Sequence, residues 1–346
     1  MYKVELLTRD GASIAFDAAP SETLLDAAER ANIFLPSSCR EGGCGACRVT
    51  IVAGETILDA HSVSALSEAE RAKGDILLCR AHAQGDLSLS APFDRASIGF
   101  APIPVRRARI VAMTPAGSSA MRLALKYEDD PQFGSAAQFV AGQFVELEIP
   151  GTDARRCYSL ANAPNWDGQL EFLVRLQPNG AFSTWLTARA AIGDSLIVHG
   201  PMGQFTLDEA SARPRIFVAG GTGLAPVLSM LRQMTEFADA RPCRLIFGVG
   251  RAQELFAQDA LAELAASLPQ LAITLCVWKP EGSWHEFVGT PAEALAVELG
   301  KVDAPPDIYV CGPPALIEAA EAVARAAGVS ADRIFAERFT VASVAT

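Results

Sequence analysis

The sequence lacks a long uninterrupted hydrophobic run. Its longest weakly polar stretch, Ile216 to Leu231, is interrupted by three glycines and by Pro226. It is shorter than the roughly 20 apolar residues that a membrane-spanning helix needs. The first residues become strand-like at once and show no apolar signal segment. The pattern therefore argues against a membrane protein, and we expect a cytoplasmic location.

The sequence also has no excess of positive charge, since its formal net charge is −11. An acidic surface repels both nucleic acid and anionic membranes, so neither is expected as a partner. It is compatible with docking onto a protein that offers a basic patch. The length of 346 residues predicts two or three domains, and half of the residues are hydrophobic, as in soluble globular proteins.

Histidine is scarce, and its few positions show no paired metal-ligand spacing. We expect His61, His82, His199 and His285 to be surface or hydrogen-bonded polar residues. The chain also shows no internal repeat and no low-complexity tract. Metal chemistry in this chain must therefore depend on other side chains.

Cysteine is plentiful and unevenly placed. Four cysteines fall within the first 80 residues in a C-x4-C-x2-C…C arrangement, namely Cys39, Cys44, Cys47 and Cys79. In a chain without a signal segment such clustering indicates metal or redox chemistry rather than disulfides. The spacing is that of plant-type [2Fe–2S] centres. Glycines at 42, 43 and 45 would permit positive φ and turn backbone N–H groups toward the sulfurs.

A structural zinc site is the alternative for these four cysteines. Zinc sites usually combine two C-x2-C pairs, whereas Cys79 stands alone in the sequence. The pattern therefore favours the iron–sulfur cluster. The scattered cysteines are predicted to be buried small hydrophobic residues: Cys157, Cys243, Cys276 and Cys311.

Residue patterns divide the chain into three domains and a linker. In residues 1–96, a hairpin of Tyr2–Thr8 with Ser13–Ala18 precedes a helix capped by Ser21, and a strand at Arg48–Val52 follows the cysteine loop. Residues 97–105, with two prolines, are expected to form a linker. Residues 106–208 contain short, regularly spaced strands, which predict a small antiparallel barrel.

Residues 213–346 show a different pattern, in which strands alternate with helices. This alternation predicts βαβ units on a parallel sheet. The expected strands are Ile216–Ala219, Cys243–Val249, Leu271–Val277 and Asp307–Val310, and the expected helices are Ala225–Glu236, Gln258–Ser267 and Pro291–Leu299. The fold class is thus a multidomain combination of α+β and α/β.

The barrel region carries a pattern suited to a flavin. Following the Pro150-Gly151 turn, Arg156 could pair with phosphate, Tyr158 could stack on a ring, and Ser159 could hydrogen-bond flavin N5. Downstream, Gly180, Phe182 and Ser183 stand at the start of a predicted helix, whose amides suit a pyrophosphate. Each pattern alone is weak evidence for a flavin site. The order of the patterns along the chain strengthens this interpretation.

The last region carries a nucleotide pattern. The residues Gly220, Gly221, Thr222 and Gly223 follow a predicted strand and precede a helix, as a dinucleotide phosphate requires. The form G-x-G-x-x-P departs from the usual fingerprint. No acidic residue is visible at the end of the second predicted strand, so the sequence shows no side chain that would hydrogen-bond the ribose 2′-hydroxyl. Arg251, at this strand end, could favour binding of a 2′-phosphate.

Two further segments complete the candidate sites. Cys311, Gly312 and Pro313 end a strand at the sheet edge where ligands bind in such folds. Phe339, near the end of the chain, could cover the flavin. Hydride transfer needs positioning rather than an acid or base, so Ser159 and Cys311 are expected to tune geometry.

The order of these motifs resembles the ferredoxin–NADP⁺ reductase superfamily with a plant-type ferredoxin at its N-terminus. More narrowly, residues 32–44, 150–153 and 217–227 resemble the reductase component of soluble methane monooxygenase and of related bacterial oxygenases. The resemblance covers essentially the whole chain. It implies a β-grasp ferredoxin domain, a six-stranded FAD barrel and an NADH domain.

By this resemblance, Arg156, Tyr158 and Ser159 would bind FAD, and Phe339 would pack on its ring. Residues 221–223 would meet NADH, with Cys311 and Gly312 near the nicotinamide. Electrons would pass from NADH through FAD and the cluster to the di-iron hydroxylase of a methane or other hydrocarbon monooxygenase, which docks transiently near the cluster loop of a monomeric reductase. Two alternatives stay open: a reductase of a benzoate-type dioxygenase, and a zinc- and nucleotide-binding module without redox activity.

Overall fold

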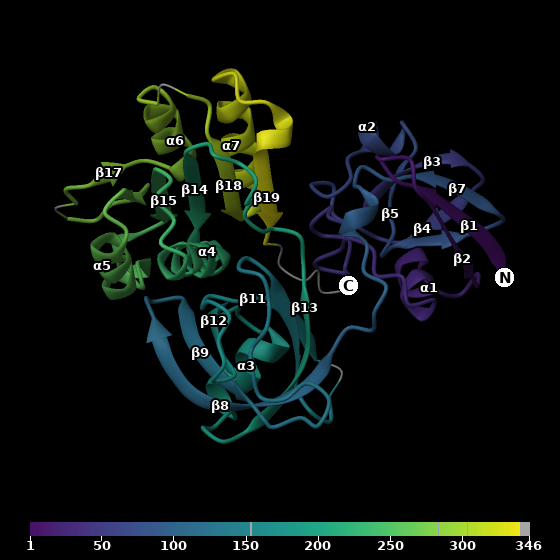
Figure 1. The fold of residues 1–346 in the computed structure, drawn as a ribbon, viewed down its shortest axis with the longest axis horizontal. Coiled ribbons are helices and arrows are strands. Elements are labelled where there is room, and N and C mark those ends of the chain that lie inside the picture. Colours follow the sequence, from purple (N-terminus) through teal and green to yellow (C-terminus); the bar gives the residue numbers. More distant parts are fainter. Residues whose placement is uncertain (153, 283, 303, 340–346) are drawn as a thin grey trace. The chain divides into compact units, whose positions relative to one another are not determined.

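The computed structural model describes residues 1–152, 154–282, 284–302 and 304–339. These residues form two compact units, Met1–Ile103 and Pro104–Arg338, and Phe339 is grouped with the first (Figure 1). The first unit contains the cysteine loop. The second contains a barrel and a parallel sheet.

The first unit is built on a five-stranded mixed sheet in the order β2-β1-β7-β3-β5. Strand β1 (Tyr2–Leu7) pairs antiparallel with β2 (Ser13–Ala18) and parallel with β7 (Leu87–Ser90). The other strands are β3 (Arg48–Ala53), β4 (Thr56–Leu58), β5 (Asp75–Leu77) and β6 (Ala81–Ala83). The helices are α1 (Leu24–Arg30), α2 (Glu68–Arg71) and the 3-10 turn η1 (Arg95–Ser97). Helix α1 packs on the sheet, and the predicted β-grasp arrangement is confirmed.

One local prediction in this unit is wrong. Helix α1 is capped by Thr23 rather than Ser21, because the Thr23 hydroxyl accepts a hydrogen bond from the Asp26 amide at 3.2 Å. The helix begins at Leu24, which together with Leu25 is fully buried in the core of the unit.

The second unit opens with six antiparallel strands in the order β11-β10-β13-β8-β9-β12. Their bounds are β8 (Val105–Ala116), β9 (Ala120–Tyr127), β10 (Phe144–Glu148), β11 (Arg155–Ser159), β12 (Gln169–Arg175) and β13 (Ser195–Met202). A bridge between Leu160 and Phe172 joins the two edge strands and closes the barrel. Alternate residues such as Leu123 and Leu125 fill its interior. The predicted six-stranded barrel is therefore confirmed.

The flavin motif comes after strand β10 and the Pro150-Gly151 turn, as expected. Residues 156–159 are themselves part of a strand, β11, which the sequence pattern had not identified. Their burial shows no clean alternation, since Arg156, Cys157 and Tyr158 are all half-buried. The sequence pattern consequently gave no strand signal here. Helix α3 (Ala181–Ala188) begins where expected, directly after Gly180.

The last part of the chain forms a six-stranded parallel sheet in the order β17-β16-β15-β14-β18-β19. Its strands are β14 (Arg215–Gly220), β15 (Cys243–Val249), β16 (Leu271–Val277), β17 (Phe287–Val288), β18 (Asp307–Gly312) and β19 (Ile334–Arg338). The helices are α4 (Leu224–Glu236), α5 (Gln258–Ser267), α6 (Pro291–Leu299) and α7 (Pro314–Ala326), with 3-10 turns η2 (Gly221–Gly223), η3 (Ala252–Glu254) and η4 (Ala331–Arg333). The predicted parallel sheet is confirmed.

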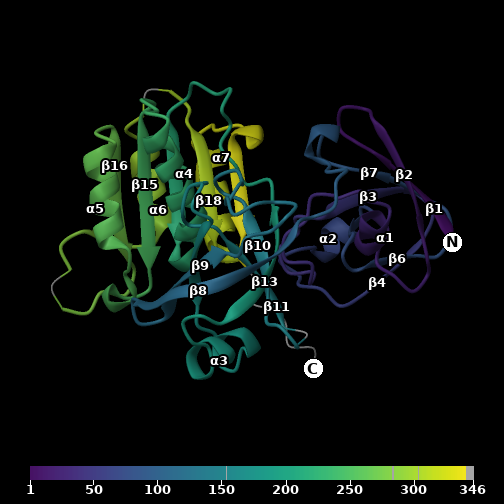
Figure 2. The ribbon, with the colours of Figure 1, turned by 60° about the horizontal axis from the view of Figure 1, so that its bottom comes forward.

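The helices of this part group into two pairs that pack beside the parallel strands (Figure 2). Helix α4 contacts α5, and α6 contacts α7. Because parallel crossovers are right-handed, the two pairs cover opposite faces of the sheet. The sequence patterns had not identified α7, β17 or β19.

Helix α4 joins the barrel to the parallel sheet. The Ser229 hydroxyl donates to the carbonyl of Asn162 at 2.7 Å, and Arg232 donates to the carbonyl of Ala161 at 2.8 Å. Arg232 also lies 3.3 Å from the carboxylate of Glu171 on β12. These contacts fix the middle of α4 against the barrel.

Gly142 permits a second close approach between segments of this unit. A Cβ at Gly142 would lie 2.0 Å from the carbonyl oxygen of Phe205, and the residue has φ of +99°. Gly193 has nearly the same φ, +98°, but a Cβ there would meet no atom within 4 Å. The two glycines thus share a backbone conformation and differ in available space.

We predict that Gly142→Ala lowers the free energy of unfolding by about 3 kcal/mol or more, because the Phe205 backbone cannot give way. The matched variant Gly193→Ala should lose only about 1 kcal/mol, from the left-handed φ alone. Urea unfolding of the second unit, followed by flavin release, measures both. Equal losses in the two variants would contradict the steric argument.

Candidate cofactor sites

The four predicted cluster ligands lie close together at one end of the first unit. Cys44, Cys47 and Cys79 are buried and Cys39 is half-buried. The Gly43 amide donates to the sulfur of Cys39 at 3.2 Å, and the Cys39 amide donates to the sulfur of Cys44 at 3.4 Å. The loop therefore aims backbone N–H groups at the sulfurs, as predicted. Such donors stabilise negative charge on thiolates.

The sulfurs are arranged as two pairs. Cys47 and Cys79 have sulfurs 3.3 Å apart, and Cys39 pairs with Cys44. Hydrogen bonding from Cys44 lowers the pKa of Cys39 to about 5, and hydrogen bonding from Cys47 lowers the pKa of Cys79. Two dithiolate pairs suit two iron atoms.

Backbone conformation in this loop differs in one detail from the prediction. Gly42 and Gly45 have positive φ, +72° and +79°, whereas Gly43 does not. The third left-handed residue is Arg40, with φ of +58°. Its guanidinium lies 3.0 Å from Asp26 and also pairs with Glu29 on α1. These ion pairs hold a residue other than glycine in the conformation that the loop needs.

The flavin motif occupies the edge of the barrel formed by β11. Tyr158 packs against Phe182, with ring centroids 5.0 Å apart, and against Phe172 at 6.5 Å. Burial raises the pKa of Tyr158, so its phenol stays protonated. Arg156 is half-buried and donates to the carbonyl of Arg155 at 2.6 Å. The structure thus brings Tyr158 and Phe182 into direct contact. Asp153 lies outside the described residues.

Helix α3 places its first turn beside this strand. No side chain caps its N-terminus in the described structure. The Ser183 hydroxyl accepts from the Gln177 amide at 2.9 Å, so its O–H can still donate to an anion. Phe182 is only 2% exposed. The backbone amides near Gly180 and the Ser183 hydroxyl are therefore the groups suited to an anion.

The two nucleotide motifs meet at the carboxyl edge of the parallel sheet. A Cβ on Gly223 would lie 2.3 Å from the carbonyl oxygen of Cys311. A Cβ on Gly220 would lie 3.2 Å from Pro313, and one on Gly312 would lie 3.2 Å from the Gly220 amide nitrogen. Only glycines allow this approach. Thr222 is buried, and no side chain caps the start of α4 in the part of the chain that the structure describes.

A residue that the sequence reasoning missed lies between the barrel and this edge. Glu337 on β19 is 7% exposed, and its carboxylate accepts a hydrogen bond from the Ser159 hydroxyl at 3.1 Å. It stands in register with Cys311, which is fully buried. Burial raises the pKa of Glu337 to about 7, and the Ser159 hydrogen bond opposes that rise. An acid directly after the apolar residues 334–336 of a strand is the signal that could have identified it.

Phe339 directly follows β19 and is half-buried. It is grouped with the cysteine unit, whereas the other predicted flavin residues belong to Pro104–Arg338. Its contact with a flavin stays a prediction. Cys243, Cys276 and Cys311 are buried as expected, whereas Cys157 is half-buried.

The end of the second parallel strand also differs from the prediction. Glu254 returns from the turn η3 and accepts hydrogen bonds from the amides of Gly250, at 2.9 Å, and Arg251, at 3.2 Å. An acidic group therefore does stand at this strand end, contrary to the sequence prediction. It was missed because it comes several residues after the strand.

Comparison with known proteins matches each part of the chain to a family model. Residues 7–84 match a 2Fe-2S iron-sulfur cluster binding domain, residues 116–207 an oxidoreductase FAD-binding domain, and residues 217–322 an oxidoreductase NAD-binding domain. The propane 2-monooxygenase reductase component of Mycolicibacterium goodii is 34% identical over 94% of both chains. The chain belongs to the family of iron–sulfur flavoprotein reductases.

Other relatives of this reductase serve different systems. Methane monooxygenase component C of Methylosinus trichosporium is 39% identical over 86% of this chain and 87% of its own length. The toluate 1,2-dioxygenase electron transfer component of Pseudomonas putida is 34% identical over 99% of both. Among solved structures, the Amycolatopsis cytochrome P450 reductase GcoB is 31% identical, with a TM-score of 0.78 over 99% of this chain and 100% of its own.

The residues present fit the three groups that this family binds. Paired thiols with amide donors suit the cluster, the uncapped start of α3 suits a pyrophosphate, and the glycine-lined edge of β14 and β18 suits a dinucleotide. In the described part of the reductase no helix is long and apolar enough to span a bilayer. His82 and His199 pair with Asp59 and Glu148, as expected for hydrogen-bonded polar residues.

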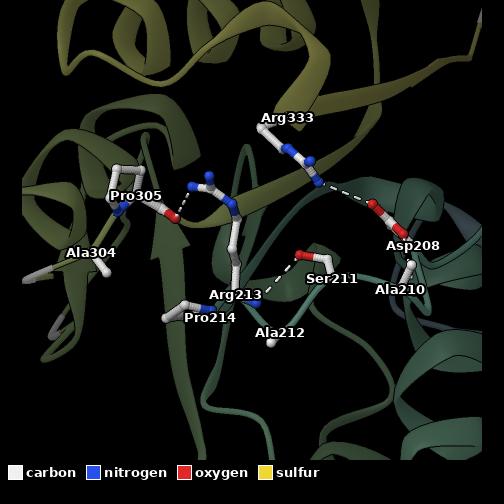
Figure 3. A pocket seen from close by; sticks show the side chains of 9 residues that line it. All are labelled: Asp208, Ala210, Ser211, Ala212, Arg213, Pro214, Ala304, Pro305 and Arg333. Atoms are coloured by element: carbon white, nitrogen blue, oxygen red, sulfur yellow. Dashed lines mark hydrogen bonds and ion pairs between the residues drawn. The ribbon is translucent and has the colours of Figure 1, made fainter.

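A cavity of about 490 Å³ lies away from these groups, at the amino ends of β14 and β18 (Figure 3). Arg213 donates to the carbonyl of Pro305 at 3.0 Å, and Arg333 lies 3.0 Å from Asp208. Ligands of parallel sheets bind at the opposite, carboxyl edge. We therefore do not assign the redox reaction to this cavity.

The buried Glu337 predicts how the stability of the reductase depends on pH. Its pKa is about 7 in the folded chain against an ordinary value of 4.5, so the folded state holds a proton that the unfolded state has lost. The stabilisation of the folded state by this proton is fully present below about pH 4.5 and is lost as pH rises through about 7. The free energy of unfolding should fall by roughly 3 kcal/mol across that range.

Glu337→Gln should flatten this pH dependence of unfolding in the cofactor-loaded protein, whereas Glu318→Gln, on the exposed side of α7, should retain it. Ser159→Ala should move the titration to higher pH, because it removes the hydrogen bond that lowers the pKa. An unchanged slope in Glu337→Gln would show that Glu337 does not carry the effect.

Proposed function

We propose that this reductase oxidises NADH and delivers electrons singly to the di-iron hydroxylase of a soluble methane or other hydrocarbon monooxygenase. The observation that carries the proposal is the Ser159–Glu337 contact, which joins the flavin motif to the nucleotide edge. The relatives named for methane and propane monooxygenases support this partner. The toluate dioxygenase relative supports the alternative, a reductase of an aromatic-ring dioxygenase.

When bound, FAD accepts a hydride and the [2Fe–2S] cluster carries single electrons. We assign cluster binding to Cys39, Cys44, Cys47 and Cys79. We assign FAD binding to Arg156, Tyr158, Ser159, Gly180, Phe182, Ser183 and Phe339. We assign NADH binding to Gly220, Gly221, Thr222, Gly223, Cys311, Gly312 and Pro313.

The reductase contributes positioning in this proposal. Glu337 orients the Ser159 hydroxyl at the barrel edge, and the glycine contacts hold the nicotinamide side of the site at the ends of β14 and β18. Fixing two reactants in this way can supply most of a catalytic effect without an acid or base. Ser159, Cys311 and Phe339 are the residues proposed to touch the reacting rings.

The remaining assignments concern organisation. We propose domains at residues 1–96, 106–208 and 213–346, with a linker at 97–105. The family-model matches lie within these limits. We also propose a cytoplasmic monomer that docks transiently through the cluster loop.

A single absorption experiment tests the redox function. The purified protein should show flavin and [2Fe–2S] bands, and both should bleach when NADH is added without oxygen. Cys47→Ser should lose the cluster band and keep the flavin band, whereas Cys243→Ser, at a buried cysteine of the parallel sheet, should keep both. A colourless preparation that contains zinc would contradict the proposal and favour the non-redox alternative.

The identity of the partner needs a separate test. We expect NADH-driven hydroxylation when the reductase is combined with the di-iron hydroxylase of a hydrocarbon monooxygenase. A Rieske dioxygenase serves as the comparison acceptor. Turnover with the dioxygenase alone would exclude the monooxygenase partner while leaving the redox function intact.

A further inference from the structure

The carboxyl ends of β15 and β16 meet in a cluster of side chains that hydride transfer does not require. The Lys279 amide donates to the carbonyl of Gly250 at 2.9 Å, which ties the two strand ends together. A Cβ on Gly250 would lie 3.0 Å from the Glu254 carboxylate and 3.1 Å from the indole nitrogen of Trp278. Glycine at position 250 thus allows an acid and an indole to converge at this sheet edge.

Trp278 presents an aromatic surface at this edge. Trp278 is 53% exposed. Lys279 holds its ammonium group 4.5 Å from the centroid of the indole ring. An exposed indole at the ligand-binding edge of a parallel sheet is a surface on which a purine base can stack.

Charged groups around Trp278 are nearly balanced. Arg251 lies 3.4 Å from the carboxylate of Glu281, and Glu254 accepts from the Gly250 and Arg251 amides. Two acids therefore offset the two bases, Arg251 and Lys279. Recognition of a 2′-phosphate usually depends on an arginine that is available to pair with it. Here a phosphate dianion would have to approach beside both Glu254 and Glu281.

We infer that Trp278 forms the adenine-stacking platform of the nucleotide site, and that Glu281, by pairing with Arg251, makes the reductase reject a 2′-phosphate and so select NADH over NADPH. This inference rests on the proposed NADH-dependent function. It concerns the adenosine half of the nucleotide, which is remote from the hydride. It also gives Arg251, which the sequence left as a possible phosphate ligand, the opposite role.

Two fragments of the nucleotide test the inference directly: adenosine 5′-monophosphate and adenosine 2′,5′-bisphosphate. Calorimetry on the cofactor-loaded protein measures their binding without any redox step. Glu281→Gln should tighten the bisphosphate by roughly 3- to 10-fold and change the monophosphate less than 2-fold, as expected for loss of one exposed charge. The matched control Glu318→Gln removes the same charge from α7 and should change the ratio of the two affinities less than 2-fold.

Separate variants test the roles of Trp278 and Arg251. Trp278→Ala should weaken both fragments by about 10-fold, because it removes the stacking surface. In the Glu281→Gln background, Arg251→Gln should abolish the gained affinity for the bisphosphate. The ratio of kcat/KM for NADPH to that for NADH should rise in Glu281→Gln and fall back in the double variant.

The outcomes separate this inference from the proposed function. If NADH bleaches the protein but neither Glu281→Gln nor Trp278→Ala alters fragment binding, the inference is wrong and the redox function stands. If NADH fails to bleach the protein, the redox function is wrong whatever the fragments show. If Glu281→Gln tightens the binding of both fragments equally, the inference is also wrong, because that result would indicate a general attraction of anions.

Discussion

The close approach of two strand ends, without room for a side chain between them, is the constraint on which the nucleotide half depends. Gly223 lies against the carbonyl of Cys311, and Gly312 lies against Gly220. This packing places the start of α4 at the carboxyl edge of the sheet. Helix α4 then holds the barrel through Ser229 and Arg232. The barrel in turn brings Ser159 within hydrogen-bonding distance of Glu337. The close approach of the strand ends therefore determines how the flavin motif lies relative to the nucleotide edge.

Charge is distributed differently at the two edges of the parallel sheet. At the amino edge, Arg215 is fully buried and pairs with Asp239 at 2.8 Å. Such a pair must stay intact, because removing one partner leaves an uncompensated buried charge. At the carboxyl edge, Glu337 is buried beside a serine and titrates near neutral pH. The amino edge thus holds a fixed structural ion pair, and the carboxyl edge holds a group whose charge can change.

The cysteine loop shows how local sequence and tertiary contacts share one task. The spacing of Cys39, Cys44 and Cys47 limits how the chain can surround a small cluster. The left-handed conformation of Arg40, however, is held by ion pairs to Asp26 and Glu29 on a separate helix. The conformation of the ligand loop therefore also depends on the packing of α1 against the sheet. A short peptide with the same cysteines would lack that support.

Sequence patterns predicted the elements with strong periodicity well. The strands β2, β15 and β16 and the helices α5 and α6 have the predicted bounds, because each combines a clear apolar period with clear end signals. Strand β11 was not recognised, because its side chains are all partly exposed except at Ser159. Helix α1 starts at Leu24 because the Thr23 hydroxyl, and not that of Ser21, supplies the cap.

What the sequence by itself determined is the chemistry that the chain carries: the cysteine spacing, the glycine-rich turn before a helix and the order of the three domains. These are local patterns, because ligand spacing and backbone freedom depend on neighbouring residues. Only the tertiary structure decided that Glu337 meets Ser159 and that Trp278 and Glu281 lie near Gly250 and Arg251. The physical reason is that these contacts join residues distant in the chain, which only the sheet register and the packing of the barrel bring together.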